Sequence, residues 1–204
     1  MLYLRLSLIA AGPPALDECI EYIEGELRPA LESQSGSLGL SLLVSPGLDV
    51  AVLESFWASA HALQASEQAA ASLRAELARR ARASVTDEQY RILVFERDAP
   101  LRGGEAVRLT RMQAKPSAVE DVTEVFGDSA VPWLAETPGF RAALLLADPG
   151  SGHLISQTVW QGTQARAASP STAAVIQADL LNASDCVIRA VEDYSLVFSS
   201  ARKP

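Results

Sequence analysis

The stretch Val50–Trp57, VAVLESFW, has a counterpart in His153–Trp160, HLISQTVW, at a separation of 160 − 57 = 103 residues. Both stretches are rich in apolar residues and end on a tryptophan, which favours a strand. The same register aligns residues that an alanine- and leucine-rich composition would not align by chance. The matching pairs are Arg5 with Arg108, Pro29 with Pro132, Gly36 with Gly139, Pro46-Gly47 with Pro149-Gly150, and Leu77 with Leu180. A period this long indicates two copies of a domain rather than a solenoid.

Outward from these two stretches, each copy predicts the same succession of elements. Apolar residues alternate along 2–10, as in a strand, and recur at helical spacing from Leu16 to Leu31. Strands at 38–44 and 50–57 flank a Pro-Gly turn, and a helix at 62–81 and a strand at 89–96 complete the copy. Pro29 is expected to kink or tighten its helix. The second copy predicts strands at 106–114, 140–147, 153–160 and 187–198, and helices at 118–136 and 165–181.

This order of elements is the split βαβ, ferredoxin-like pattern of the α+β class. Two helices cover one face of such a sheet, so the other face needs a partner, and a tandem copy supplies it. Val52 and Phe56 alternate with Leu53 and Trp57, which makes both faces apolar. We therefore expect two tandem ferredoxin-like βαββαβ units, packed sheet to sheet as an intrachain dimeric α/β-barrel. The units are expected at 1–97 and 105–204, with 98–104 as the linker.

The composition argues against several partners. The net charge is −8 without a run of lysine or arginine, and an acidic surface repels nucleic acid and anionic membranes. Cys19 and Cys186 form no CxxC motif, so two reduced, buried thiols are expected rather than a disulfide or a zinc site. Only two histidines, His61 and His153, are present, so no metal site is expected.

The apolar N-terminal residues 1–11 require a choice between a signal peptide and a strand. Arg5 interrupts the run at its centre, and the apolar stretch is too short for the hydrophobic region of a signal peptide. We interpret it as the first strand of a cytoplasmic protein. No segment approaches the length of a transmembrane helix.

Several short motifs recur in the two copies. They are Pro132-Trp133-Leu134 followed by Pro138-Gly139-Phe140-Arg141-Ala142, the weaker counterpart Pro29-Ala30-Leu31 followed by Gly36-Ser37-Leu38-Gly39, the strand ends Glu54-Ser55-Phe56-Trp57 and Gln157-Thr158-Val159-Trp160, and the helix starts 62–66 and 165–169. Together they resemble the antibiotic-biosynthesis-monooxygenase domain of the dimeric α/β-barrel group, twice, over nearly the whole chain. The resemblance implies cofactor-independent oxygenases of aromatic substrates, haem-degrading enzymes, or related isomerases and peroxidases. It also implies a barrel made within one chain, with a further homodimer allowed.

By this resemblance, Trp57 and Trp160 occupy the position of the family's pocket tryptophan. In one interpretation each ring is a wall against which a planar aromatic substrate stacks. In the other, which we favour, each is a large core side chain whose N–H is hydrogen-bonded.

Arg5 and Arg108 stand at the same place in the two first strands, inside an apolar alternation. A buried guanidinium is costly unless it is paired. One interpretation is that each arginine binds an enolate or carboxylate of a substrate. The alternative, which we favour, is an ion pair with an acid such as Glu54, Glu96 or Glu192.

Three further residues are candidates for substrate binding. Tyr22 is expected to donate a hydrogen bond to a quinone-type oxygen, Glu54 to act as a base if it is desolvated, and His61 to lie at the start of the second helix. Haem degradation is disfavoured, because the resemblance then requires a histidine on the second helix and an asparagine on the first strand. Those places hold Glu67 or Pro170, and Ser7 or Thr110, none of which is an axial haem ligand.

The sequence thus leaves two functions open. The first is a cofactor-independent monooxygenase acting on a small hydrophobic or aromatic substrate, with a closed pocket beside a tryptophan. The second is a non-catalytic duplicated barrel that binds a small ligand or a partner. The motifs of the common hydrolases, kinases and nucleotide-binding enzymes do not occur in the sequence.

Overall fold

The computed structural model describes residues 1–45, 47–148, 150–169 and 186–202. Its strands and helices alternate in the order β-α-β-β-α-β, twice. The chain clusters into two compact units, Met1–Tyr90 with the C-terminal residues from Val197, and Arg91–Leu196. Each unit is described by itself below.

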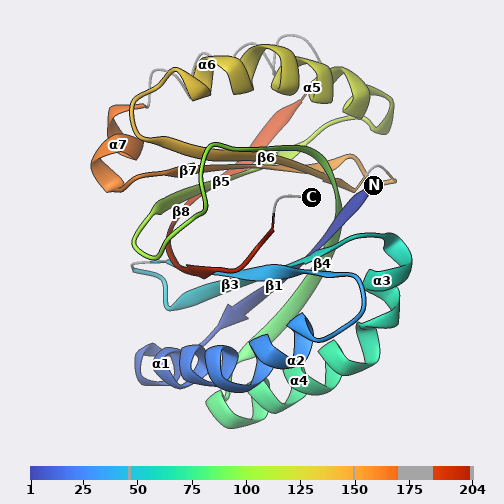
Figure 1. Cartoon of the computed structure of the whole chain (residues 1–204), viewed down its shortest axis with the longest axis vertical. Coiled ribbons are helices and arrows are strands. Elements are labelled where there is room, and N and C mark those ends of the chain that lie inside the picture. Colours follow the sequence, from blue (N-terminus) through green and yellow to red (C-terminus); the bar gives the residue numbers. More distant parts are fainter. Residues whose placement is uncertain (46, 149, 170–185, 203–204) are drawn as a thin grey trace. The chain divides into compact units, whose positions relative to one another are not determined.

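The first unit begins with β1 (Leu2–Ala10), followed by a helical segment made of α1 (Pro13–Tyr22), η1 (Ile23–Leu27) and α2 (Arg28–Glu32). β2 (Ser37–Val44) and β3 (Val50–Trp57) form a hairpin, and α3 (Ala60–Ala65), α4 (Glu67–Ala81) and β4 (Ser84–Arg97) follow. α1, α2 and α4 cover one face of this unit's sheet (Figure 1). Ile23 and Leu27 of η1 and Leu77 of α4 pack there with Leu40, Leu42 and Leu53 of the sheet.

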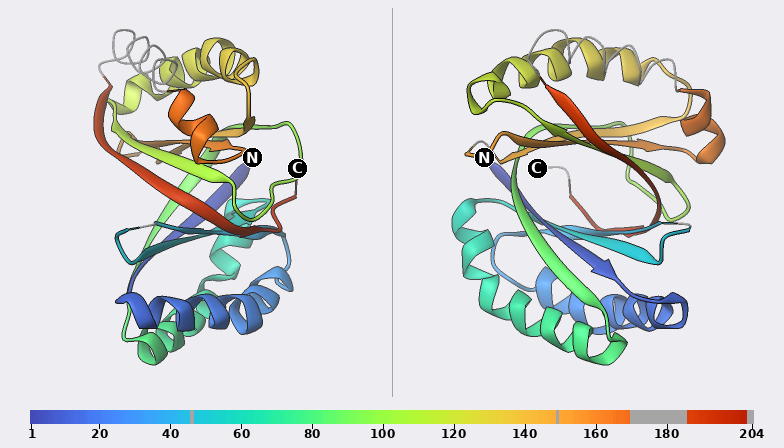
Figure 2. Two further views of the ribbon diagram at one scale, coloured as in Figure 1. Left: turned by 90° about the vertical axis from the view of Figure 1, so that its left-hand side faces the viewer. Right: turned by 180° about the vertical axis from the view of Figure 1, so that it is seen from behind.

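The second unit repeats this order. It contains β5 (Ala106–Gln113), η2 (Pro116–Ala118), α5 (Val119–Val125), η3 (Phe126–Ala130) and α6 (Val131–Ala135). It continues with β6 (Phe140–Asp148), β7 (His153–Trp160), α7 (Thr163–Ala168) and β8 (Val187–Ser199). α5 and α6 cover one face of this sheet in all the views (Figure 2). Phe126 and Leu134 pack there on Leu145 and Trp160.

The eight strands of the described chain hydrogen-bond in the closed order β1-β3-β2-β8-β5-β7-β6-β4. This is an antiparallel barrel with helices, of the α+β class, as the sequence predicts. The last strand of each copy is long and belongs to both units. Residues Arg91–Arg97 of β4 pair with β6 in the second unit, and Ser200 and Arg202, just beyond β8, donate hydrogen bonds to Leu40 and Leu38 in the first. The sequence analysis placed the units at 1–97 and 105–204. In the structure, residues 91–97 group with the second unit and the residues from Val197 group with the first.

Both proline-containing helices include a π-helical turn. η1 precedes Arg28-Pro29 and η3 precedes Val131-Pro132, at positions that differ by 126 − 23 = 103 residues. Proline lacks an N–H and its ring clashes with the carbonyl of the preceding turn. The wider π turn accommodates this conflict without ending the helix. Pro29 therefore changes the local helix geometry, as expected, but the helix widens rather than tightens.

A glycine brings the second helix close to the sheet in each unit. Gly36 has φ +79°, and a Cβ added to it would lie 2.5 Å from the Cβ of Ala62. Gly139 has φ +86°, and its added Cβ would lie 2.6 Å from that of Ala165. Each glycine also accepts a backbone hydrogen bond, from Ala58 or from Gln161, just beyond β3 or β7. These contacts fix where α3 and α7 begin.

The predicted elements agree closely with the structure in type. β1, β3 and β7 have the predicted bounds, whereas β4 begins at Ser84 instead of residue 89. The helix predicted at 62–81 is divided at Ser66 into α3 and α4. Residues 170–181 of the other predicted second helix lie outside the described residues. In the described part, no helix is long and apolar enough to cross a membrane.

Candidate functional site

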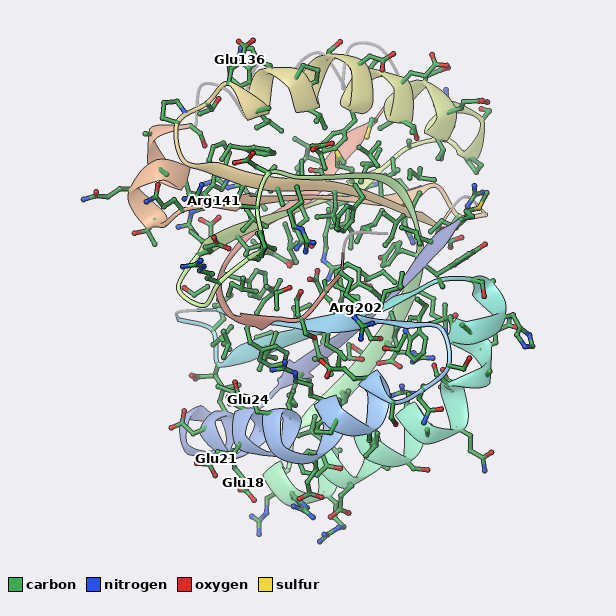
Figure 3. All side chains as sticks on the ribbon, viewed as in Figure 1. Glu18, Glu21, Glu24, Glu136, Arg141 and Arg202 are labelled. Atoms are coloured by element: carbon green, nitrogen blue, oxygen red, sulfur yellow. The ribbon has the colours of Figure 1, made fainter. Side chains whose placement is uncertain are left out.

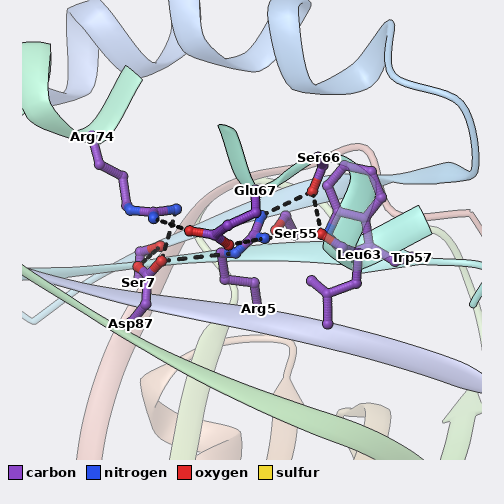
Figure 4. A network of polar contacts seen from close by, with 9 residues as sticks. All are labelled: Arg5, Ser7, Ser55, Trp57, Leu63, Ser66, Glu67, Arg74 and Asp87. Atoms are coloured by element: carbon purple, nitrogen blue, oxygen red, sulfur yellow. Dashed lines mark hydrogen bonds and ion pairs between the residues drawn. The ribbon is translucent and has the colours of Figure 1, made fainter. Parts of the chain in front are cut away.

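The most extensive polar cluster of the first unit surrounds Arg5, between the sheet and the second helical segment (Figure 4). The guanidinium of Arg5 is 2% exposed. It donates hydrogen bonds to Glu67 Oε2 at 2.6 Å, to the Leu63 carbonyl at 3.1 Å and to Ser66 Oγ at 3.2 Å. Its Nε lies 3.7 Å from Asp87 Oδ2 on β4. Arg5 thus ties β1 to α3, α4 and β4.

A second arginine completes this cluster. Arg74 on α4 lies 2.7 Å from Glu67 Oε1 and 2.7 Å from Asp87 Oδ2, and Ser7 donates to Asp87 at 2.7 Å. Arg5, Arg74, Glu67 and Asp87 are named here the Arg5 network. Two cations and two carboxylates balance in charge, which makes burial of Arg5 tolerable.

The protonation states follow from this arrangement. Burial lowers the pKa of Arg5, against the opposing charges of Glu67 and Asp87. Burial alone would raise the pKa of Glu67, but the hydrogen bond from Arg74 and the charges of Arg5 and Arg74 outweigh it, so that pKa is lowered. Glu67 is therefore an ionised partner of the arginines at neutral pH and a weak base.

Trp57 lies on the same face of the sheet as Arg5. Its ring is fully buried against Ala62 and Leu63 of α3, and its N–H donates to Ser55 Oγ at 3.0 Å. The Arg5 guanidinium carbon is 5.9 Å from the centroid of this ring, within the range of a cation–π contact. Ser55 is also the cross-strand neighbour of Arg5, so the strand register itself brings Arg5 to Trp57.

The second unit has a similar arrangement of an arginine and a tryptophan on neighbouring strands, with other charged residues around the arginine. Arg108 on β5 stands opposite Thr158 on β7 and Asp193 on β8, and residues opposite one another point to one face of a sheet. The Trp160 N–H donates to Thr158 Oγ1 at 3.1 Å. Asp193 accepts from Arg108 at 3.1 Å and lies 3.3 Å from Arg166 of α7. Arg108, Arg166 and Asp193 are named here the Arg108 cluster.

An open pocket lies at the end of β7, directly after Trp160. Its volume is about 420 Å³, and it is lined by Gln161, Gly162, Thr163, Gln164 and Ala165. Trp160 itself is buried and contacts Phe140 edge to face, with ring centroids 5.8 Å apart. This pocket has the size expected for a small-molecule site, but it is open where a closed one was predicted.

The other predicted site residues do not converge on either tryptophan. Tyr22 of α1 is buried in the helix–sheet core, where the guanidinium of Arg80 stacks at 4.8 Å from its ring. His61 is exposed on α3. Glu54 is fully buried on β3, but strand alternation turns it to the face opposite Ser55 and Trp57. Of the predicted site residues, Arg5 contacts Trp57 directly, and Arg108 and Trp160 are linked through Thr158.

Both arginines are ion-paired, as one of the two interpretations expected, but the acids named for this were wrong. The partners are Glu67, Asp87 and Asp193 rather than Glu54, Glu96 or Glu192. Glu192 instead accepts from Arg111 at 3.2 Å. The reason is alternation: Asp193 is directly opposite Arg108, and Glu192 is opposite the next residue, Leu109.

Sequence reasoning missed the helix residues of these clusters, although two signals were present. Glu67 and Ser7 attracted notice only as replacements of haem-associated residues, yet both belong to the polar contacts around Arg5. Glu67 and Arg74 are seven residues apart, which places them on one face of a helix. A buried arginine in an apolar strand requires an acid nearby, and this helix face supplies one.

The predicted state of the cysteines is confirmed, since Cys19 and Cys186 are buried free thiols. Burial raises the pKa of both thiols. Among the described residues, no group of three or more His, Cys, Asp or Glu side chains could hold a metal ion. On the outer face of α1 and η1, Glu18, Glu21 and Glu24 point away from the sheet as separate solvated side chains (Figure 3).

Two uncharacterized proteins resemble this chain in sequence. No family model matches it. The uncharacterized protein Rv2558 of Mycobacterium tuberculosis is 26% identical over 205 residues, which cover all of this chain and 87% of that protein. A second protein of the same species, Rv2557, is 27% identical over 165 residues, or 81% of this chain and 74% of that protein.

Solved structures of other proteins share the fold of this chain, at lower sequence identity. An anthrone oxidase-like protein superposes with a TM-score of 0.71 at 16% identity, over 97% of this chain and 92% of that one. A ferredoxin-fold protein related to antibiotic biosynthesis monooxygenases, from Listeria monocytogenes, has a TM-score of 0.51 at 12% identity, over 94% of both chains. The fold is therefore that of the monooxygenase-like dimeric α/β-barrels.

Proposed function

We propose that this chain is a cofactor-independent monooxygenase that oxidises a small hydrophobic or aromatic substrate in its second unit. The observation that supports this most directly is the pocket of about 420 Å³ at Gln161–Ala165. The pocket begins at the residue after Trp160. The Trp160 N–H donates to Thr158, and Thr158 is the cross-strand neighbour of Arg108. The guanidinium of Arg108, on the strand that pairs with β7, suits a ring system that carries an ionisable oxygen.

The proposed chemistry needs little from the protein. An anthrone-type substrate loses a proton from its CH₂ group to solvent, and the positive charge of Arg108 stabilises the resulting enolate oxygen. The enolate carbon transfers electrons to O₂ and becomes a hydroperoxide. Loss of water then leaves a carbonyl, so CH₂ and O₂ give C=O and H₂O. The substrate supplies all the electrons, and the pocket supplies position and charge.

Oxygen uptake tests this proposal. Purified protein in air-saturated buffer without added metal or cofactor is expected to oxidise anthrone with one O₂ consumed per anthraquinone formed, above the background of heat-denatured protein. Trp160→Phe should lower the rate at least tenfold, because it leaves a gap in the core directly before the pocket and removes the N–H bonded to Thr158. Trp57→Phe is the matched control and should retain activity. Equal loss in both variants, or a rate at background, contradicts the proposal.

A non-catalytic barrel is the second candidate. It is favoured by the full burial of Trp57 and by the charge-balanced Arg5 network, which leaves the first unit's counterpart of the site filled. In that case planar aromatic ligands would bind with no O₂ consumed. The same measurements, extended to ligand binding, separate the two functions.

We also propose that the two units arose by tandem duplication of one ancestral domain. The matching π turns, Gly–Ala contacts and tryptophan hydrogen bonds, each displaced by 103 residues, support this origin. A cytoplasmic location is proposed as well, supported by two free thiols. Cell fractionation tests the location.

A further inference from the structure

The charges around the equivalent arginines differ between the two units. In the first unit Arg5 and Arg74 share two carboxylates, those of Glu67 and Asp87. In the second, among the described residues, Arg108 and Arg166 share one, that of Asp193. The Arg108 cluster therefore has one positive charge more than the acids it contains.

The sequence explains this difference. At a spacing of 103 residues, Glu67 corresponds to Pro170, Arg74 to Gln177 and Asp87 to Ala190. The two acids of the Arg5 network thus have uncharged counterparts. Arg166 instead corresponds to Leu63, so the second unit has gained a cation at the place where the first offers a backbone carbonyl.

The donors of the Arg108 cluster are not all satisfied. Arg5 Nε and Arg166 Nε are both buried without a hydrogen bond. Arg5 Nε lies 3.7 Å from Asp87 Oδ2, whereas Arg166 pairs with Asp193 through its terminal nitrogen, at 3.3 Å. Asp193 is itself 39% exposed, so solvent weakens its compensation of the two arginines. A buried guanidinium donor without an acceptor is costly, and an acceptor brought by a ligand removes that cost.

Glu67 indicates what this acceptor is. Its carboxylate bridges two guanidinium groups in the first unit, at 2.6 Å from Arg5 and 2.7 Å from Arg74. Arginines bind carboxylates and similar planar anions through paired hydrogen bonds. In the second unit the pocket is lined by Gln161–Ala165, and Arg166 is the next residue of α7.

We propose that Arg108 and Arg166 bind an anionic oxygen group, a carboxylate or an ionised phenol, on the aromatic ligand of the second unit. This inference rests on the proposed function for the location of the ligand, and it adds the ligand's charge. The Arg5 network is the same arrangement with its anion supplied by the chain itself. The second unit therefore selects anionic aromatic compounds over neutral ones of equal shape.

Titration calorimetry with 2-naphthoate and its neutral analogue 2-naphthamide tests the inference. Wild-type protein is expected to bind the acid at least tenfold more tightly than the amide. Arg166→Gln and Arg108→Gln should each weaken naphthoate binding at least tenfold and leave naphthamide binding within about twofold. Arg166→Lys, which keeps the charge but not the paired donors, should fall between wild type and Arg166→Gln.

Arg141→Gln is the matched control, because it removes the same charge from the same unit at a residue that pairs with Glu105. It should leave both affinities unchanged. Thermal melts show whether each variant is folded. Equal binding of acid and amide, no binding of either, or an equal effect of Arg141→Gln overturns the inference. Selective naphthoate binding without oxygen uptake supports the inference and contradicts only the oxygenase proposal, whereas oxygen uptake without charge selectivity does the reverse.

Discussion

Arg5 on β1 and Glu67 on α4 are 62 positions apart in the chain and are joined by a 2.6 Å hydrogen bond. Arg5 is buried, whereas the Glu67 side chain is 45% exposed. Together with Arg74 and Asp87, this bond connects α4 to the sheet. Without these carboxylates the buried charge of Arg5 would have no ionic partner. Its contribution to stability should therefore exceed that of a surface ion pair.

Glu67→Gln tests this contribution. The substitution removes the charge that Arg5 faces, and it should lower the free energy of unfolding by about 1–2 kcal/mol, since Arg5 keeps its bonds to Leu63 and Ser66. Urea denaturation at pH 7 measures the change. Glu76→Gln on the same helix removes a carboxylate that pairs only with exposed arginines and should have a much smaller effect. Similar losses in the two variants would contradict the special role of Glu67.

The same pair predicts a dependence on pH. The pKa of Glu67 is lowered in the folded state, so its ionised form stabilises the fold. That stabilisation is complete above the unfolded-state pKa, near 4.5, and is lost as the pH falls through the lower folded-state value. The stability difference between wild type and Glu67→Gln should thus be constant from pH 6 to 8 and shrink towards pH 3. A difference that does not change over this range would show that Glu67 acts without its charge.

The fold could be predicted from the sequence because its information is local and repeated. Strand alternation in 2–10 and 50–57 marks elements whose bounds agree with the structure. The π turns before Pro29 and Pro132 could not be foreseen, because a proline in a helix can be accommodated by a kink, a tighter turn or a wider one. The length of β4 was underestimated at its start, Ser84 rather than residue 89, whereas the prediction for β8 was one residue short.

The candidate site was predicted only in part, for a related reason. A strand register follows from the sequence once the strands are known, and it places Arg5 by Ser55 and Trp57. Which helix residue reaches Arg5 depends on how α4 packs across the sheet. That depends on contacts between residues far apart in the sequence, such as Arg74 of α4 with Asp87 of β4, which no local pattern encodes.

The close glycine contacts lead to a prediction for both units. Gly36→Ala and Gly139→Ala each place a side chain at positive φ and against the Cβ of Ala62 or Ala165. Each should lower the free energy of unfolding by about 2–4 kcal/mol. Gly25→Ala is the control, because Gly25 is helical with open space around it, and it should be neutral or slightly stabilising. Chemical denaturation compares all three, and a neutral Gly36→Ala would mean that α3 moves freely on the sheet.

Gly39 offers a test of how the end of the chain is held on the first unit. It has φ +107° at an irregularity of β2, and a Cβ there would collide with the carbonyl of Ser200. Ser200 and Arg202 donate 2.8 Å backbone hydrogen bonds to Leu40 and Leu38. Gly39→Ala should break these bonds, because the strained backbone and the new side chain both push the C-terminal segment from β2.

Hydrogen exchange measures this effect at single amides. In Gly39→Ala the amides of Ser200 and Arg202 should exchange at least tenfold faster than in wild type. The Ser45 amide, which donates to Val50 at the other end of β2, should be unchanged. Gly12→Ala, at a glycine with no atom near its added Cβ, serves as the control. Unchanged protection of Ser200 in Gly39→Ala would mean that other contacts, such as Ser200 Oγ with Glu32 and Arg28 with Phe198, hold this segment in place.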